Sequence, residues 1–97
     1  MRYEIELSPE AIEDLKGLKA NRRAHVKKAM ETHLRHEPTK TSKRRIKRLR
    51  GLSKPQYRLR VGDLRVFYDV SNRQVEVLAI VAKADADAWL TKVGEKL

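Results

Sequence analysis

Residues 57–68 read YRLRVGDLRVFY, in which three arginines, Arg58, Arg60 and Arg65, lie on either side of a Gly-Asp pair. A planar guanidinium donates two parallel hydrogen bonds to phosphate oxygens, so a group of arginines is typical of a phosphate-binding site. The arginines alternate with apolar residues, which predicts two β-strands joined by a two-residue turn at the Gly-Asp pair. The segment therefore predicts a hairpin that carries phosphate-binding chemistry on one face.

The turn also predicts which side chains share a face, because a two-residue loop sets the register of a hairpin. Arg60 then faces Arg65, and Arg58 faces Phe67. We expect Tyr57 to lie on the opposite, inner face. The other inner-face residues form the expected core of the hairpin: Leu59, Val61, Leu64, Val66 and Tyr68.

Two arginines that face each other across a hairpin destabilise it by up to about 1 kcal/mol. One interpretation is a solvated outer face on which Asp69 and Glu76 relieve part of the repulsion, although both lie further along the hairpin. The alternative is a face that holds a phosphate, whose arrival removes the repulsion. We favour the phosphate site, because a hairpin that only had to fold would not gather like charges at one place.

Two residues near the C-terminus are candidates for the same site. Lys83 follows the last predicted strand and would complete a basic cluster at the strand end, although an ordinary exposed lysine is the simpler interpretation. Trp89 is the only tryptophan. It either packs a helix onto the sheet or provides a platform on which a base stacks.

A second source of positive charge is the stretch TKTSKRRIKRLRGLSKP at residues 39–55. Ile46, Leu49 and Leu52 would anchor this stretch to the body of the protein, so we expect a partly anchored loop rather than a free tail. Lys40 is one of its basic residues. Six others are the residues that we expect to bind RNA or the ribosome: Lys43, Arg44, Arg45, Lys47, Arg48 and Arg50.

The composition favours a polyanionic partner. The 97 residues include 23 Lys and Arg against 13 Asp and Glu, a formal charge of +10, which favours RNA, DNA or an acidic protein. The length predicts one domain over residues 1–97. The absence of cysteine excludes disulfide and thiolate chemistry and suits a cytoplasmic location. No run approaches the roughly 20 apolar residues of a membrane span, so we expect no membrane partner.

Other catalytic motifs are missing from the sequence. His33 and His36 are three positions apart on a predicted helix, a spacing that allows metal binding, but no third ligand is evident. No glycine-rich phosphate loop, nucleophile elbow or paired-carboxylate site appears. We therefore expect neither a metal nor another cofactor.

Hydrophobic periodicity predicts the elements that position these residues. Tyr3 to Leu7 alternate as a strand, and Ser8-Pro9 starts a helix whose apolar stripe is Ala11, Ile12, Leu15 and Leu18. The remaining elements are a helix over about 21–36 with Val26, Ala29, Met30 and Leu34 inward, strands over about 56–61, 64–70 and 74–81, and a helix over about 85–96.

The order of these elements predicts an α+β fold with helices on one face of a mainly antiparallel sheet. The last strand is predicted to be central. Its alternation places Val75, Val77, Ala79 and Val81 on one face, with Leu78 and Ile80 on the other.

The run IKRLRGLSKPQYRLRVGDLRVFYDV resembles the signature of the RelE/ParE superfamily of bacterial and archaeal toxins. That signature is Leu-x-Gly, then Tyr-Arg-x-Arg-x-Gly-Asp, then a strand bearing an arginine. The resemblance extends over essentially the whole chain. It implies a RelE-like fold, similar to microbial ribonucleases: an N-terminal strand, a helix hairpin, a three-stranded antiparallel meander that joins a four-stranded sheet, and a short C-terminal helix.

The resemblance is stronger to the RelE branch, whose members are toxins of type II toxin–antitoxin systems. It implies a ribosome-dependent, metal-independent endoribonuclease that cuts messenger RNA in the A site by attack of the ribose 2′-hydroxyl. Its partners would be the ribosome, messenger RNA and a RelB-like antitoxin that masks the basic face, in complexes that pair into larger assemblies.

Roles for single residues follow from the same resemblance. Arg58 and Arg60 fall where the branch places basic residues on the first hairpin strand, and Arg65 matches its transition-state arginine. Lys83 falls at the basic position after the last strand. Trp89 falls where the branch has a functional tyrosine. Two departures lower the catalytic strength that the resemblance implies: an indole exchanges no phenolic proton, and a lysine lacks the fork of an arginine.

Three alternatives stay open at this point. The ParE branch of the same fold inhibits DNA gyrase and needs no phosphate cradle. A plain RNA- or ribosome-binding module would use the 40–50 stretch without cleaving RNA. A degenerate toxin would bind its antitoxin without activity. Only cleavage of an RNA bond separates the nuclease from the last two.

Overall fold

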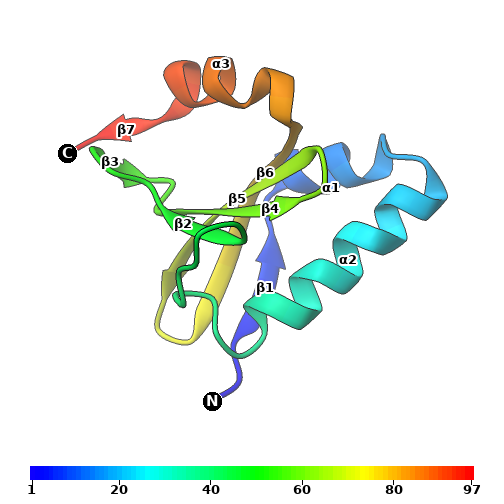
Figure 1. Cartoon of the computed structure of the whole chain (residues 1–97), viewed down its shortest axis with the longest axis horizontal. Coiled ribbons are helices and arrows are strands. Elements are labelled where there is room, and N and C mark those ends of the chain that lie inside the picture. The colour runs from blue at the N-terminus through cyan, green and yellow to red at the C-terminus, as the bar shows by residue number, and fades with distance from the viewer.

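A mixed five-stranded sheet in the order β1-β6-β5-β4-β2 forms the centre of the computed structural model, which describes all 97 residues (Figure 1). The α+β fold predicted from the sequence is confirmed. The elements are β1 Glu4–Leu7, α1 Pro9–Lys16, α2 Ala20–Leu34, β2 Ile46–Arg48, β3 Leu52–Lys54, β4 Tyr57–Val61, β5 Leu64–Ser71, β6 Gln74–Ala82, α3 Lys83–Val93 and β7 Glu95–Lys96.

The helix hairpin begins where the sequence predicts. Ser8 caps α1, because its Oγ accepts the N–H of Ala11 at 3.1 Å, and Pro9 occupies the first turn. Ile12, expected in the apolar stripe, is 42% exposed, and Ala11 is the one buried side chain of α1. None of the three helices combines the length with the apolar character that a membrane-spanning helix needs.

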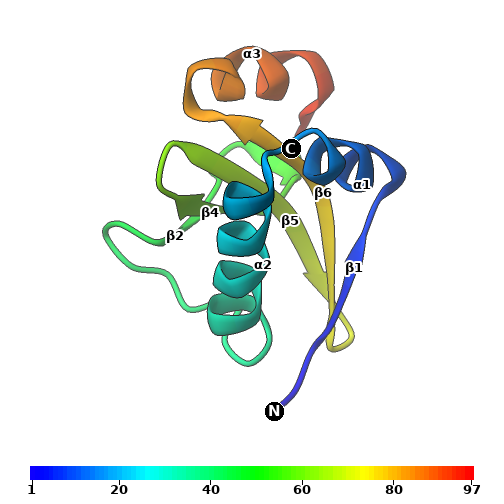
Figure 2. The ribbon, with the colours of Figure 1, turned by 90° about the vertical axis from the view of Figure 1, so that its right-hand side faces the viewer.

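Helices α1 and α2 cover one face of the sheet, where the main core lies (Figure 2). The side chains of α2 that were predicted to face inward are the ones that are buried: Val26, Ala29, Met30 and Leu34. Helix α3 lies on the opposite face, where Trp89 stacks on Phe67. The prediction that all helices share one face was therefore wrong for α3, since Phe67 adds an apolar contact to the face that carries the arginines.

A β-bulge at Leu78 interrupts the central strand β6. Phe67 of β5 pairs with Ala79, but the next residue, Tyr68, pairs with Val77, so Leu78 is an extra residue without a partner. A bulge of this kind reverses the faces of all side chains beyond it.

The reversal corrects the face predicted for the last strand. Val75 and Val77 belong to the core under the helices, as predicted, and beyond the bulge it is Ile80 that joins this core. Ala79 and Val81 instead face the other side, opposite Phe67 and Arg65. A simple alternation contains no signal for the extra residue.

Side chains of the N-terminal segment bind backbone groups of β6 beyond Val77, where the pairing of β6 with β1 ends. The Oγ of Ser8 donates to the carbonyl of Leu78 at 2.8 Å, and Asp14 Oδ2 accepts the N–H of Ile80 at 2.9 Å. Burial raises the pKa of Asp14, the bond from Ile80 opposes the rise, and nearby Glu10 adds to it. The end of β6 that leads to Lys83 is thus held by α1.

Replacement of Asp14 tests this bracing. Asp14→Ala leaves the buried N–H of Ile80 without an acceptor and is expected to cost about 1–3 kcal/mol of unfolding free energy. Asp14→Asn keeps an acceptor oxygen, and its free energy of unfolding is expected to match or exceed that of the wild type at neutral pH. Because the folded-state pKa of Asp14 is raised, its charge costs stability as pH rises, so any advantage of the Asn variant disappears in acid. Urea unfolding of the wild type, Asp14→Ala and Asp14→Asn measures these differences. Glu13→Ala, at an exposed position, is the control and should stay within about 0.5 kcal/mol of the wild type.

Candidate functional site

The hairpin of β4 and β5 has the register that the Gly-Asp turn predicts. Arg60 pairs with Arg65, and Arg58 pairs with Phe67. Gly62 has a φ of +58°, the left-handed conformation that glycine adopts without strain at the first position of such a turn. The three arginines therefore share the face away from α1 and α2, as expected.

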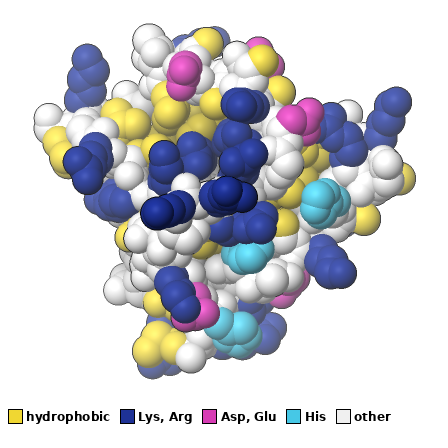
Figure 3. All heavy atoms as spheres, viewed as in Figure 1, with side chains coloured by type: hydrophobic (Ala, Val, Ile, Leu, Met, Phe, Trp, Pro, Cys, Tyr) yellow, Lys and Arg dark blue, Asp and Glu magenta, His cyan; other side chains and the backbone are white.

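The short strand β2 extends this face with more positive charge. It pairs with β4 so that Lys47 lies beside Arg58, and the N–H of Arg60 donates to the carbonyl of Arg45 at 2.8 Å. We call the resulting group the basic face: Arg45, Lys47, Arg58, Arg60 and Arg65. Lys and Arg side chains gather across the middle of the surface on which β2 lies (Figure 3).

The prediction of a loop over residues 39–55 was therefore only partly right. Ile46 is buried and pairs with Leu59, as an anchor should, but the chain around it forms strand β2, and Leu52–Lys54 forms β3. The alternation Arg45-Ile46-Lys47 is the signal for this strand. It is weak, because a three-residue strand forms only through its pairing with a distant partner.

Arg65 is the most buried member of the basic face. It is 6% exposed, and its Nη1 donates to the carbonyls of Gly62 and Leu64, both at 2.9 Å. Burial and the charge of Arg60 lower the pKa of Arg65, while Asp63 opposes the change. Arg65 lies on the predicted outer face, but its side chain is buried there, because the guanidinium folds back onto its own turn.

Arg58 lies between Lys47 and Phe67 and is half-buried. Its Nε is buried and has no hydrogen-bond partner. Burial, followed by the charges of Arg65 and Arg60, lowers the pKa of Arg58. A guanidinium remains a cation over the ordinary pH range, so the lowered pKa reports an uncompensated positive site.

No carboxylate compensates this charge. Asp69 and Glu76, considered as relieving acids, both lie 3.9 Å from Lys54 Nζ, and Asp69 also accepts the N–H of Gln56. Asp63 at the turn binds Arg22. None of the five ion pairs in the structure involves a member of the basic face.

Lys83 joins the same end of the sheet. It is the exposed first residue of α3, and its backbone N–H donates to the carbonyl of Asp63 at 2.7 Å. This bond ties the start of α3 to the hairpin turn. The structure therefore places Lys83 next to the turn that orients Arg60 and Arg65.

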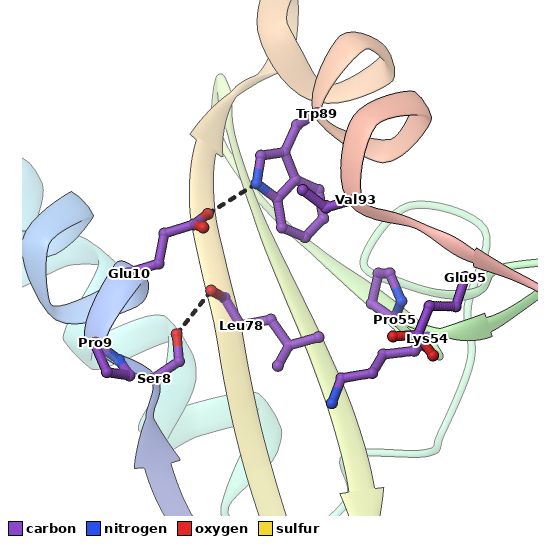
Figure 4. Close-up of a pocket in the computed structure, with 9 residues that line it drawn as sticks. All are labelled: Ser8, Pro9, Glu10, Lys54, Pro55, Leu78, Trp89, Val93 and Glu95. Atoms are coloured by element: carbon purple, nitrogen blue, oxygen red, sulfur yellow. Dashed lines mark hydrogen bonds between the residues drawn. The ribbon is translucent and has the colours of Figure 1, made fainter.

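Trp89 is engaged in packing. Its ring stacks on Phe67 with centroids 4.9 Å apart and 13° between the planes, and its Nε1 donates to Glu10 Oε2 at 2.8 Å. It points toward α1 and borders a cavity of about 260 Å³ whose lining includes Leu78 and Pro55 (Figure 4). The stacked face and the bound indole nitrogen support the packing interpretation over a base-stacking platform.

The remaining aromatic side chains lie on the core side. Tyr68 is buried, its hydroxyl donates to the carbonyl of Pro38 at 2.6 Å, and burial raises its pKa. Tyr57 stacks on Tyr68 with centroids 5.5 Å apart. Neither tyrosine belongs to the basic face, as expected.

The two histidines of the metal hypothesis have other surroundings. Burial and the charge of Arg45 lower the pKa of His33, and the Nδ1 of His36 lies 3.1 Å from the carbonyl oxygen of Met1. No group of three or more His, Asp or Glu side chains is placed to hold a metal.

The six basic residues expected to bind RNA or the ribosome separate into groups. Arg45 and Lys47 belong to the basic face. Arg48 lies over the ring of Tyr57 at 5.2 Å and donates to the carbonyl of Gln56. Arg44, Lys43 and Arg50 are exposed and form no ion pair.

The basic face is suited to a phosphodiester. It combines guanidinium forks with a lysine on three adjacent strands, and none of its members is neutralised by an acid. None of the side chains at these register positions is a histidine or a carboxylate. The arrangement can hold and stabilise negative charge, but it offers no conventional proton acceptor.

Comparison with protein families identifies one match. Residues 5–86 match the family described as ParE toxin of type II toxin-antitoxin system, parDE. No curated protein matches the sequence.

Solved structures share the fold. RelE in the archaeal RelE–RelB complex from Pyrococcus horikoshii OT3 is 23% identical, with a TM-score of 0.70, over 86% of this chain and 97% of that one. A double mutant of E. coli toxin RelE in the free state is 20% identical, with a TM-score of 0.69 over 92% of both chains. A chain of the RelBE2 complex from Mycobacterium tuberculosis is 24% identical, with a TM-score of 0.67, over 84% of this chain and 99% of that one.

The packing role of Trp89 predicts a specific energetic coupling. Trp89→Phe keeps a ring on Phe67 but loses the bond to Glu10, and is expected to cost about 0.5–1.5 kcal/mol of unfolding free energy. Glu10→Ala should cost a similar amount. The double variant, Trp89→Phe with Glu10→Ala, should lose no more unfolding free energy than either single variant. Trp89→Ala, which also removes the stack, should cost about 3 kcal/mol. Urea unfolding tests this, with exposed Lys92→Ala as control, and additive losses in the double variant would contradict the coupling.

Proposed function

The chain belongs to the RelE/ParE superfamily of type II toxin–antitoxin toxins, and we propose that it is a ribosome-dependent endoribonuclease that cuts messenger RNA in the A site. One observation carries the proposal: five cationic side chains on one face of the sheet, without a counter-ion, in an arrangement that only an anion relieves. A protein that only bound a partner surface would not need two arginines opposite each other at the most constrained point of a hairpin.

The proposed reaction is an internal transesterification. The ribose 2′-oxygen forms a bond to the adjacent phosphorus, and the bond from phosphorus to the 5′-oxygen breaks. The 2′-hydroxyl loses its proton and the 5′-oxygen gains one. One fragment then ends in a 2′,3′-cyclic phosphate, and the other begins with a 5′-hydroxyl. Negative charge on the phosphoryl oxygens grows in the transition state, where fixed cations are most effective.

We assign Arg65 and Arg60 to the phosphoryl oxygens. They face each other across the hairpin, and Arg65 is held in place by two backbone carbonyls. A donor that is already oriented pays little reorganisation on reaching the transition state. Lys83, at the strand end beside the turn, is assigned to the leaving 5′-oxygen, to which it can deliver a proton.

Deprotonation of the 2′-hydroxyl is the weak point of this site. Arg58 stabilises the developing oxyanion electrostatically, because arginine hardly deprotonates and is a poor base. The proton then passes to solvent. Trp89, at the position of the family's tyrosine, positions α3 and exchanges no proton. We therefore expect slower chemistry than in a site that contains a true base.

An antitoxin is the proposed protein partner. Several of the structurally similar proteins were solved as toxin–antitoxin complexes, including those from Pyrococcus horikoshii and Methanococcus jannaschii. An acidic segment of an antitoxin laid over the basic face would neutralise its charge and exclude RNA. This would make toxicity depend on release of the partner.

Inhibition of DNA gyrase is the second candidate function, because the family model that matches the chain is described as a ParE toxin. The two candidates require different chemistry from the same fold. Gyrase inhibition is a protein–protein interaction and does not depend on Arg65 touching a phosphate. The following measurements separate them.

Cleavage in programmed 70S ribosomes tests the proposal. The purified toxin, free of antitoxin, is expected to cut within the A-site codon, as read by primer extension, and to leave naked RNA intact. Arg60→Ala, at an exposed position, and Arg65→Ala should each lower the rate about 100-fold, as loss of a transition-state donor does. Arg65→Lys should cut at a rate between those of Arg65→Ala and the wild type.

Controls decide what a failure means. Arg65→Ala frees two carbonyls, so circular dichroism must show that it folds. Exposed Arg73→Ala, at the far turn of the sheet, should cut at the wild-type rate. Absence of cleavage by folded wild type, with inhibition of gyrase supercoiling, would establish the second candidate and reject the nuclease. Absence of both would identify a toxin fold without either activity.

A further inference from the structure

A hollow of about 530 Å³ adjoins the basic face at the hairpin turn. Its lining consists of Arg44, Arg45, Arg60 and Gly62, without an apolar side chain or a carboxylate. Arg60 is thus common to the basic face and to the hollow. A concave surface with three arginines and no acid is the chemistry of an anion-binding site.

The loop before β2 is pinned in place, which gives the hollow a defined shape. The N–H of Ser42 donates to the carbonyl of Ile46 at 2.9 Å, and Ser42 Oγ accepts the N–H of Arg45 at 3.0 Å. Backbone pairing then holds Arg45 against Arg60, whose carbonyl also lies 3.4 Å from Arg45 Nη1. Arg44 and Arg45 are therefore presented by a structured turn and not by a free tail.

The opposite rim is open, and the acid beside it is already paired. A Cβ added to Gly62 would meet nothing within 4 Å, so this rim faces free space. The acid next to it, Asp63, is bound by Arg22 from α2. An incoming anion therefore meets three guanidinium groups without an unpaired carboxylate beside them.

We infer that this hollow binds a second phosphate of the same RNA strand, that of a nucleotide next to the scissile one. The inference rests on the proposed function. Arg45, which directly precedes β2, lies in one row with Arg60 of β4 and Arg65 of β5. Arg65 and Arg45 are thus two strand spacings apart, roughly 10 Å, with Arg60 between the two phosphates. The second site fixes the direction and register of the strand.

The assignment divides the basic stretch by role. Arg44 and Arg45 line the hollow and contact the defined phosphate, whereas Arg50 does not line it. Arg44→Gln and Arg45→Gln should each weaken binding of a six-nucleotide 2′-O-methyl RNA about tenfold and lower the salt slope by about 1. Arg73→Gln, the matched control, should change affinity less than twofold. Fluorescence anisotropy at several salt concentrations measures this.

Neutral phosphates identify the contact itself. A methylphosphonate, which carries no charge, replaces the phosphate at each linkage in turn. At one linkage, the hollow linkage, it should weaken wild-type binding about tenfold. The hollow linkage should be next to the linkage at which a methylphosphonate no longer weakens binding by Arg65→Gln. At the hollow linkage, the methylphosphonate should not weaken binding by the Arg45→Gln variant any further. The inference would be overturned if the Arg45 substitution and the methylphosphonate lowered affinity additively at every linkage. It would also be overturned if millimolar inorganic phosphate displaced the labelled RNA as well as the unlabelled oligonucleotide does.

Two further arms separate this inference from others. If the wild type cuts messenger RNA in ribosomes but no linkage is coupled to Arg45, the inference about the hollow is wrong and the proposed function stands. If the coupling appears but nothing is cut, the function is wrong and the hollow stands. If the Arg44 and Arg45 variants bind the oligonucleotide normally but lose affinity for an acidic antitoxin peptide, the hollow takes a protein partner and the inference is overturned.

Discussion

The register of the β4–β5 hairpin is the constraint on which the rest of the site depends. A slip of β4 by one residue would turn Arg58 and Arg60 toward the core and expose the fully buried Leu59. A slip of β5 would do the same to Arg65 and the fully buried Val66. The two-residue turn prevents the slip, and it places Arg60 opposite Arg65 at a cost that Asp63 offsets only in part, since neither arginine forms an ion pair. The fold therefore maintains a repulsion next to its tightest turn, and an anion on that face is what removes it.

The other elements hold this hairpin and extend it. Strand β2 brings Arg45 and Lys47 to its open edge, while α3 covers the β5 and β6 side of the same face. Helix α3 is bound at its start by the Asp63 carbonyl and in its middle by the stack of Trp89 on Phe67. The positive charge is thereby confined to the part of the sheet that stays open.

Much of this arrangement could be predicted from the sequence, because it is encoded locally. The Gly-Asp turn gave the register, and the Ser8-Pro9 pair gave the start of α1. The missed features depend on distant contacts: β2 needs its partner β4, and the bulge at Leu78 is stabilised by Ser8 and Asp14 from another element. The burial of Arg65 was missed for a different reason, since a side chain that folds back onto its own turn leaves no pattern in the sequence.

The central claim is that this face directs attack by a ribose 2′-hydroxyl, and a single atom tests it. Messenger RNAs with one 2′-deoxy nucleotide at successive positions of the A-site codon would be placed in programmed ribosomes with wild-type toxin. The account predicts that cleavage stops only when the deoxy sugar lies 5′ to the scissile phosphate. It also predicts that the 5′ fragment of the unsubstituted control RNA ends in a 2′,3′-cyclic phosphate after cutting. Cleavage that continues past that substitution, or a product with a free 3′-hydroxyl, would contradict it.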